Sequence, residues 1–177
     1  MNWSIREVAR VLLVVVVLSG GVLSGASDVW GQEKAGTLAQ QIQGSWILVS
    51  IYNEQDGKRI EALGSKPRGS MILTSDGRFS MILMRASLPK FGSNNRMKGT
   101  AEENRAVVQG SIAFFGSYAV ASEKEQTVNL RIEGSTFPNW DGQDQKRVMT
   151  AKGDELKVTN PTGSFGGTNY IVWKRAK

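Results

Sequence analysis

Alternation of apolar and polar residues identifies one segment of the chain as a half-buried β-strand. Between Thr127 and Glu133, apolar residues occupy every second position. Successive side chains of a strand point to opposite faces, so one face of this segment should lie in a core and the other in solvent. The inward set is Val128, Leu130 and Ile132, and the outward set is Asn129, Arg131 and Glu133. An orientation of Arg131 into the lumen of a barrel is the alternative.

Strand signals of similar length recur along the chain, separated by turn residues. Asp76-Gly77 lies between two apolar runs and is a strong hairpin signal. Gly116 interrupts another apolar run, and a glycine inside a strand marks a bulge or a close backbone approach. The predicted strands are 45–53, 70–74, 78–84, 112–121, 127–133, 145–150, 156–160 and 168–174. About eight strands with short turns predict an all-β fold, an eight-stranded up-and-down antiparallel β-barrel with no open sheet edge.

The strand predicted at 78–84 is apolar on both faces. One face carries Phe79, Met81 and Leu83, and the other carries Ile82 and Met84. Such a strand is either buried on both sides or lines an apolar cavity. Methionine suits an adaptable pocket because its thioether is flexible and polarizable. The pattern leaves open both plain core packing and a ligand cavity.

Two short helices interrupt the strand pattern. Residues 35–43 form a helix candidate that ends at Gly44, and such a segment can plug one end of a barrel. Residues 85–99 form a long polar loop. Loops of this length without secondary structure usually have a function or are mobile. Thr100 and Glu103 then have the spacing of a capping box, which starts a helix that stops near Gly110.

The first residues have the order of a secretory signal peptide. Arg6 and Arg10 precede an unbroken apolar run at 11–18, and small residues follow it. Cleavage before Ser27 fits the small residues that precede it, and cleavage before Gln32 is a second candidate. The chain is therefore expected to be exported to the periplasm or secreted.

The expected domain organisation has three parts. Residues 1–26 are the signal peptide, extended to 31 by the second cleavage site; 27–39 are a linker and the start of the short helix; 40–177 are the barrel. An uncleaved N-terminal membrane anchor is the alternative, although the apolar run is shorter than the ~20 residues needed to span a bilayer. After cleavage, no stable membrane insertion is expected.

Composition removes several classes of function. The chain has 22 Lys and Arg against 16 Asp and Glu, a net charge of +6, but its basic residues are scattered. Nucleic-acid binding is not expected without a basic patch interleaved with aromatics. The chain has no Cys and no His, which excludes thiolate nucleophiles, Ser–His–Asp triads and most transition-metal sites. No cofactor and no metal are expected.

The two ends of the predicted barrel domain carry residues that suit each other. Gly44-Ser45-Trp46 opens the first strand, and Trp173-Lys174-Arg175 ends the last. A guanidinium over an indole face gains about 0.5–2 kcal/mol of cation–π energy. Gly44, Trp46 and Arg175 are therefore predicted to form a structural clasp that joins the first and last strands.

These two motifs resemble the lipocalin pattern, in which a Gly-x-Trp on the first strand lies under a basic side chain from near the C-terminus. The chain is most similar to the bacterial and fungal lipocalin-like domain family, over about residues 40–175. The resemblance rests on residues 44–60, 65–85, 114–120, 135–147 and 170–175. Relatives often have histidine near Asn129 and Leu130, so a function of that imidazole does not transfer. The resemblance implies the barrel fold, and proteins of this architecture include both carriers and cyclase- or isomerase-like enzymes.

The candidate ligand-binding residues are apolar, aromatic or cationic residues expected around the lumen. A phenol inside an apolar pocket can orient a ligand, and an aromatic loop residue can stack at the rim. The candidates are Phe79, Met81, Leu83, Phe114, Tyr118, Arg131 and Trp140. No set of residues forms a catalytic constellation.

Three functions from different classes remain. The leading hypothesis is an exported barrel that binds a small hydrophobic or amphipathic molecule in its lumen. The second is a cofactor-free cyclase or isomerase that polarises a hydrophobic substrate with Arg131, Glu133 or a tyrosine. The third is a structural envelope protein whose barrel is only a scaffold, which a contiguous exposed apolar patch would favour.

Overall fold

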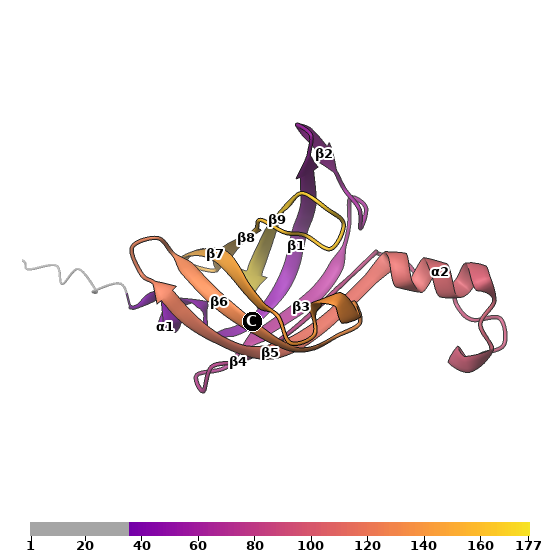
Figure 1. Ribbon diagram of the computed structural model, residues 1–177, viewed down its shortest axis with the longest axis horizontal. Helices are drawn as coiled ribbons and strands as arrows, with labels where there is room; N and C mark the ends of the chain where they lie inside the picture. The colour runs from indigo at the N-terminus through magenta and orange to yellow at the C-terminus, as the bar shows by residue number, and fades with distance from the viewer. Residues whose placement is uncertain (1–35) are drawn as a thin grey trace, which may run out of the picture. The chain divides into compact units, whose positions relative to one another are not determined.

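The computed structural model describes residues 36–177, which form one antiparallel sheet with two α-helices and two short 3₁₀ helices (Figure 1). The predicted signal peptide, 1–26, its alternative cleavage site and most of the predicted linker lie outside the described residues. The elements are α1 (Leu38–Ile42), β1 (Gly44–Gln55), β2 (Lys58–Ile60), β3 (Arg68–Leu73), β4 (Arg78–Met84), η1 (Arg96–Lys98), α2 (Ala101–Gly110), β5 (Ser111–Ser122), β6 (Thr127–Ser135), η2 (Pro138–Trp140), β7 (Asp144–Lys152), β8 (Glu155–Asn160) and β9 (Thr168–Arg175).

The sheet closes on itself. Each strand from β3 to β9 pairs antiparallel with the next, β1 pairs with β3, and β9 returns to β1. The closing register runs from Trp46 opposite Arg175 to Glu54 opposite Thr168. The wall therefore has eight strands, β1 and β3–β9. The short strand β2 forms a hairpin with the end of β1 and is not part of the closed wall. This arrangement confirms the predicted up-and-down barrel.

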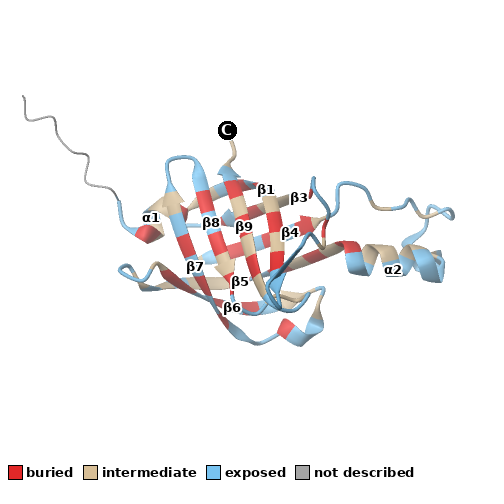
Figure 2. Ribbon diagram, turned by 90° about the horizontal axis from the view of Figure 1, so that it is seen from above, coloured by how far each residue is buried: buried red, intermediate tan, exposed pale blue. Residues whose placement is uncertain are grey.

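The lumen is filled by the alternate residues that point inward. On β6, Val128, Leu130 and Ile132 are at most 1% exposed, whereas Arg131 and Glu133 between and beside them are exposed. Figure 2 shows the same alternation of buried and exposed bands along neighbouring strands. The predicted orientation of this strand is therefore confirmed.

The outer face of β4 corrects the expectation of burial on both sides. Phe79, Met81 and Leu83 point inward and are at most 5% exposed. On the opposite face, Ile82 is 43% exposed. A barrel wall is one layer thick, so a strand within it has only one face toward the core.

Gly116 lies at the predicted bulge. The pairing of β5 with β6 shifts register between Phe115 and Gly116. A Cβ at Gly116 would lie 1.9 Å from the carbonyl oxygen of Arg131. The close approach of the two backbones therefore requires glycine here.

One end of the barrel, the closed end, is plugged by α1 as predicted. Thr37 and Gln40 form a capping box that starts the helix, and Leu38 and Ile42 are almost fully buried. The indole Nε1 of Trp46 donates to the carbonyl of Ile42 at 2.8 Å. Burial of the two aliphatic side chains and this hydrogen bond hold the short helix on the barrel.

The opposite end, the mouth, carries η2 and the loop of residues 161–167. The loop after β4 and helix α2 also lie on this side, and α2 projects away from the barrel (Figure 1). The predicted capping box of Thr100 and Glu103 starts α2. Glu103 also accepts from the backbone N–H of Gly92 at 2.8 Å, and these hydrogen bonds lower the pKa of its carboxyl. Among the described residues, no helix has the length and hydropathy to cross a membrane.

Candidate functional site

The closed end brings together the three residues of the predicted clasp. The Arg175 guanidinium lies 4.2 Å above the ring of Trp46, which is fully buried. Arg175 also donates to the carbonyls of Gln43 at 2.7 Å and Gln41 at 2.8 Å. Gly44 has a φ of +118°, and a Cβ there would lie 2.8 Å from the guanidinium. The indole of Trp46 and the guanidinium of Arg175 therefore both donate to carbonyls of the plug and of the residue that ends it.

The mouth half of the lumen contains a small pocket of about 20 Å³, room for about one water molecule. The described residues thus enclose no open, ligand-sized lumen. The walls of the pocket come from six strands, η2 and the loop 161–167. The lining residues are Ile51, Met81, Leu83, Ile112, Phe114, Trp140, Arg147, Val158, Asn160, Ser164, Phe165, Asn169 and Ile171.

Four of the predicted ligand-binding residues line this pocket: Met81, Leu83, Phe114 and Trp140. The Phe114 and Trp140 rings meet edge to face at 5.2 Å between centroids. Phe79 lies behind them, 5.9 Å from Phe114 in a second edge-to-face contact. The aromatic residues therefore form one connected cluster, with Phe79 as its support rather than part of the pocket wall.

Tyr118 lies near the closed end, away from the pocket. Its hydroxyl donates to the carbonyl of Thr74 at 2.8 Å, and partial burial raises the pKa of the phenol. Tyr118 therefore does not line the pocket with the other predicted residues. The direction of the β5 strand explains this position, because Phe114 lies toward the mouth and Tyr118 lies four residues farther along.

Arg131 points outward, which contradicts its prediction as a lumen residue. Its guanidinium pairs with Asp144 of β7 at 3.2 Å, and its side chain is 53% exposed. The reason is the strand period, because Leu130 and Ile132 on either side occupy the inward positions.

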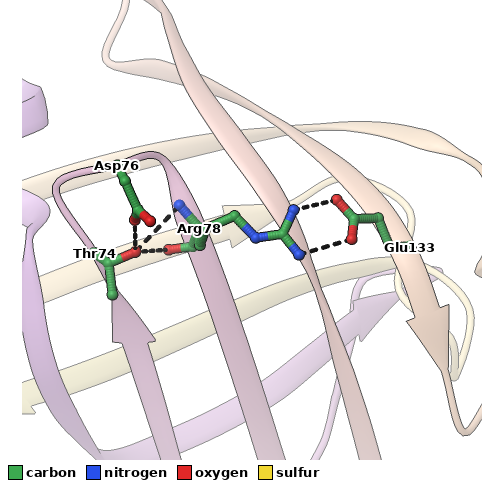
Figure 3. Close-up of polar contacts among 4 residues, drawn as sticks. All are labelled: Thr74, Asp76, Arg78 and Glu133. Carbon is green, nitrogen blue, oxygen red and sulfur yellow. Dashed lines mark hydrogen bonds and ion pairs between the residues drawn. The ribbon is translucent and has the colours of Figure 1, made fainter.

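Glu133 also lies on the outer surface, in a polar cluster at the β3–β4 turn (Figure 3). Arg78 reaches across β5 and donates to both carboxylate oxygens of Glu133, one of them at 2.7 Å. The ion pair lowers the pKa of Glu133 and raises that of Arg78. Thr74 donates to Asp76 and thereby lowers the pKa of that carboxyl. This cluster fastens three strands together and faces solvent.

Arg147, a residue that the sequence analysis did not select, points into the lumen from β7. It is 2% exposed. Its Nη1 donates to the carbonyl of Lys146 at 3.0 Å, and its Nη2 donates to the side-chain oxygen of Gln145. Burial lowers the pKa of Arg147 to about 10, which still leaves the guanidinium charged at neutral pH. The sequence contains one indication of this orientation: Arg147 is two residues from the inward-facing Met149, and residues two apart on a strand point to the same face.

Buried asparagines surround the mouth of the lumen. Asn160 Nδ2 donates to Asn169 Oδ1 at 3.4 Å, and both residues line the pocket. Asn53 Nδ2 donates to the carbonyl of Gly166 at 2.9 Å. Two buried atoms of this group, Asn169 Nδ2 and Asn53 Oδ1, have no partner among the described residues. The mouth thus combines an apolar wall with polar groups that are incompletely satisfied.

Phe165 separates the pocket from a second cavity outside it. That outer cavity measures about 90 Å³ and also lies against Val108, Thr136 and Phe137. Ile112, Ser164 and Phe165 line both cavities. Displacement of the Phe165 side chain would therefore join the two spaces.

A model of the lipocalin-like domain family matches residues 43–176, in agreement with the barrel architecture. The 4'-hydroxy-3'-methoxypropiophenone carrier protein ppsC of Aspergillus oryzae is 29% identical over 102 residues, which span 52% of this chain and 92% of that protein. Crystal structures of two variants of the fluorescent protein UnaG align with TM-scores of 0.38 and 0.36 at 12% identity, over 78% and 77% of this chain and 98% and 97% of theirs.

Proposed function

Because the chain belongs to the lipocalin-like domain family, we propose that it binds a small amphipathic molecule in the mouth half of its barrel. The observation that carries this proposal is the pocket itself, an apolar wall with a few convergent polar groups under a single aromatic side chain. A barrel of eight strands can hold one small ligand, but the pocket of this barrel has room for only about one water molecule and must widen to admit a ligand.

Binding requires the loop 161–167 to move. The loop contains three glycines, at positions 163, 166 and 167, and Phe165 at its tip is 36% exposed. Asn53 ties the loop to the wall through the carbonyl of Gly166, and Asn160 ties it through the N–H of Thr162 at 3.1 Å. A few hydrogen bonds and a partly exposed ring make opening inexpensive in free energy relative to unfolding of the barrel.

The comparison with a carrier protein favours carriage over catalysis. The curated relative is named as a carrier of an aryl ketone, and an aryl ketone matches an aromatic wall with hydrogen-bond donors. The alternative of a cyclase or isomerase loses two of its three proposed groups, because Arg131 and Glu133 both face outward and only a tyrosine remains.

Calorimetric titration with 4'-hydroxy-3'-methoxypropiophenone tests the site. We expect saturable binding by the wild type, loss of binding in Leu83→Trp, which fills the pocket, and retention in Ile82→Trp. The two positions are adjacent on β4 but face the lumen and the exterior, respectively. Circular dichroism establishes that both variants fold. Binding that survives Leu83→Trp or disappears equally in both variants would refute a lumen site.

Export is a second part of the proposal and is supported by the sequence of residues 1–26. We propose that the protein acts in the periplasm or outside the cell after cleavage. Mass spectrometry of the protein from its own host should find a mature N-terminus at Ser27 or Gln32. An intact N-terminus in the membrane fraction would support the anchor instead.

The outer wall favours a second candidate function, contact with a membrane surface in the cell envelope. Ile47, Ile72, Ile82 and Phe115 are 41–51% exposed on adjacent strands, and they alternate with serines in the paired register. Exposed apolar side chains that gather on one face of a protein often mark interaction sites. Sedimentation with anionic phospholipid vesicles tests this function, which predicts binding by the wild type and its loss in Ile82→Ser/Phe115→Ser.

A further inference from the structure

We propose that the ligand of the mouth pocket carries an anionic oxygen group, a carboxylate or an ionised phenol, which binds the guanidinium of Arg147. This inference rests on the proposed ligand-binding function and specifies the chemistry that the pocket selects. It is carried by two buried donors that face the same small space.

The first donor is the charge of Arg147. Among residues 36–177, none of the ion pairs includes this side chain. Its two hydrogen-bond acceptors are neutral, a carbonyl and an amide oxygen. A guanidinium has five N–H groups in a planar fork, so three remain for a further acceptor. A buried cation without an anion is unfavourable, so the guanidinium gains from an anionic acceptor.

The second donor is the side-chain amide of Asn169. Its Nδ2 is buried and has no acceptor among the described residues, while its Oδ1 is oriented by Asn160. Both Arg147 and Asn169 line the pocket. Two unsatisfied donors of this kind require an acceptor, and a negatively charged oxygen is the strongest acceptor available. The orphan acceptor at this end, Asn53 Oδ1, belongs to a residue outside the pocket wall.

The remainder of the wall defines the rest of the ligand. Met81, Leu83 and Phe114 offer only carbon and sulfur surface, and the Trp140 ring lies 6.0 Å from the Arg147 guanidinium. The pocket therefore suits a molecule with one anionic end and an apolar, preferably aromatic, body. Cationic ligands are excluded, because they would meet Arg147 in a site of low dielectric constant.

A matched pair of ligands tests the inference. Hydrocinnamate has an aromatic ring and a carboxylate, and methyl hydrocinnamate has the same skeleton without the charge. Calorimetric titration of the wild type should show the acid binding at least about tenfold more tightly than the ester. Arg147→Met should reduce this ratio to near one, and Arg147→Lys, which keeps the charge but not the planar fork, should give an intermediate ratio.

Arg131→Met is the control, because it removes a guanidinium from the neighbouring strand on the outer face. It should leave the ratio of the two affinities unchanged. Equal binding of acid and ester by the wild type, or a ratio that Arg147→Met does not change, would overturn the inference and leave the proposed function standing. Failure of both compounds to bind would overturn the proposed function, and this inference with it.

Discussion

The two ends of the barrel each place an arginine against a tryptophan, with opposite results. At the closed end, Arg175 lies 4.2 Å from the Trp46 ring and donates to two carbonyls that terminate α1. At the mouth, Arg147 lies 6.0 Å from Trp140, is more deeply buried, and keeps donors without acceptors. An arginine beside a tryptophan therefore stabilises the barrel at the closed end, whereas at the mouth the arginine lacks acceptors for some of its donors. At the mouth, buried donors without acceptors line a pocket, and a ligand is the partner that would satisfy them.

The largest expected loss of stability comes from a substitution at the closed end. Trp46→Ala removes a fully buried indole together with its hydrogen bond to Ile42, and it should lower the free energy of unfolding by about 3–5 kcal/mol. Urea denaturation followed by circular dichroism measures the loss. An unchanged transition midpoint would contradict the structural role of this end.

Exchange of each arginine for methionine compares the two ends directly. Arg175→Met removes the donors to Gln41 and Gln43 and should destabilise by about 2 kcal/mol. Arg147→Met removes an uncompensated buried charge but also the donor to the Gln145 side chain, so it should leave the stability of the unliganded protein within about 1 kcal/mol of the wild type. The thermal midpoint should therefore fall clearly in Arg175→Met and change little in Arg147→Met. A loss of stability in Arg147→Met comparable to that in Arg175→Met would remove the distinction.

Phe165→Ala sharpens the comparison at the mouth. The side chain is partly exposed and belongs to a loop, so its truncation should cost less than about 1 kcal/mol of stability. Stopped-flow binding of the propiophenone should instead show faster association, because the ring no longer covers the pocket. Native-state hydrogen exchange should be faster in residues 161–167 than in α1 for both proteins, and the reverse order would contradict a mobile mouth.

The smallest effect concerns the ion pair between Arg78 and Glu133, which belongs to neither end. Because Arg78 lowers the pKa of Glu133 below 4.5, the pair stabilises the folded state above that pH, and its contribution disappears as the pH falls through the lowered pKa. Glu133→Gln should therefore lower the thermal midpoint slightly at neutral pH and not at acidic pH. The pair is solvent-exposed, so salt should also reduce the difference.

The fold was more predictable from the sequence than the site, and particular residues show why. Alternation on β6 defines its inward face without ambiguity, and Gly116 marks the bulge, because both signals are local. On β7, Gln145, Lys146 and Arg147 are consecutive polar residues, so polarity does not show which of them point into the lumen. Only their spacing from the inward-facing Met149, in steps of two residues, shows it. A shift of one residue reverses the orientation of every side chain, so the sequence alone does not single out Arg147 as the arginine of the lumen. The position of Phe165 depends on the conformation of a glycine-rich loop, which periodicity does not encode.

Closure through β1 and β9 has a consequence for how the chain reaches its fold. β1, which begins at Gly44, forms its longest strand pairing with residues 168–175. The contacts that close the barrel therefore join the first and last strands, which are far apart in the sequence. Such topology makes folding slow, since a large loop must close before the pairing stabilises it. A nascent chain cannot complete the barrel until its last strand leaves the ribosome. A chain truncated before Thr168 would expose the edges of β1 and β8 to intermolecular pairing and aggregation.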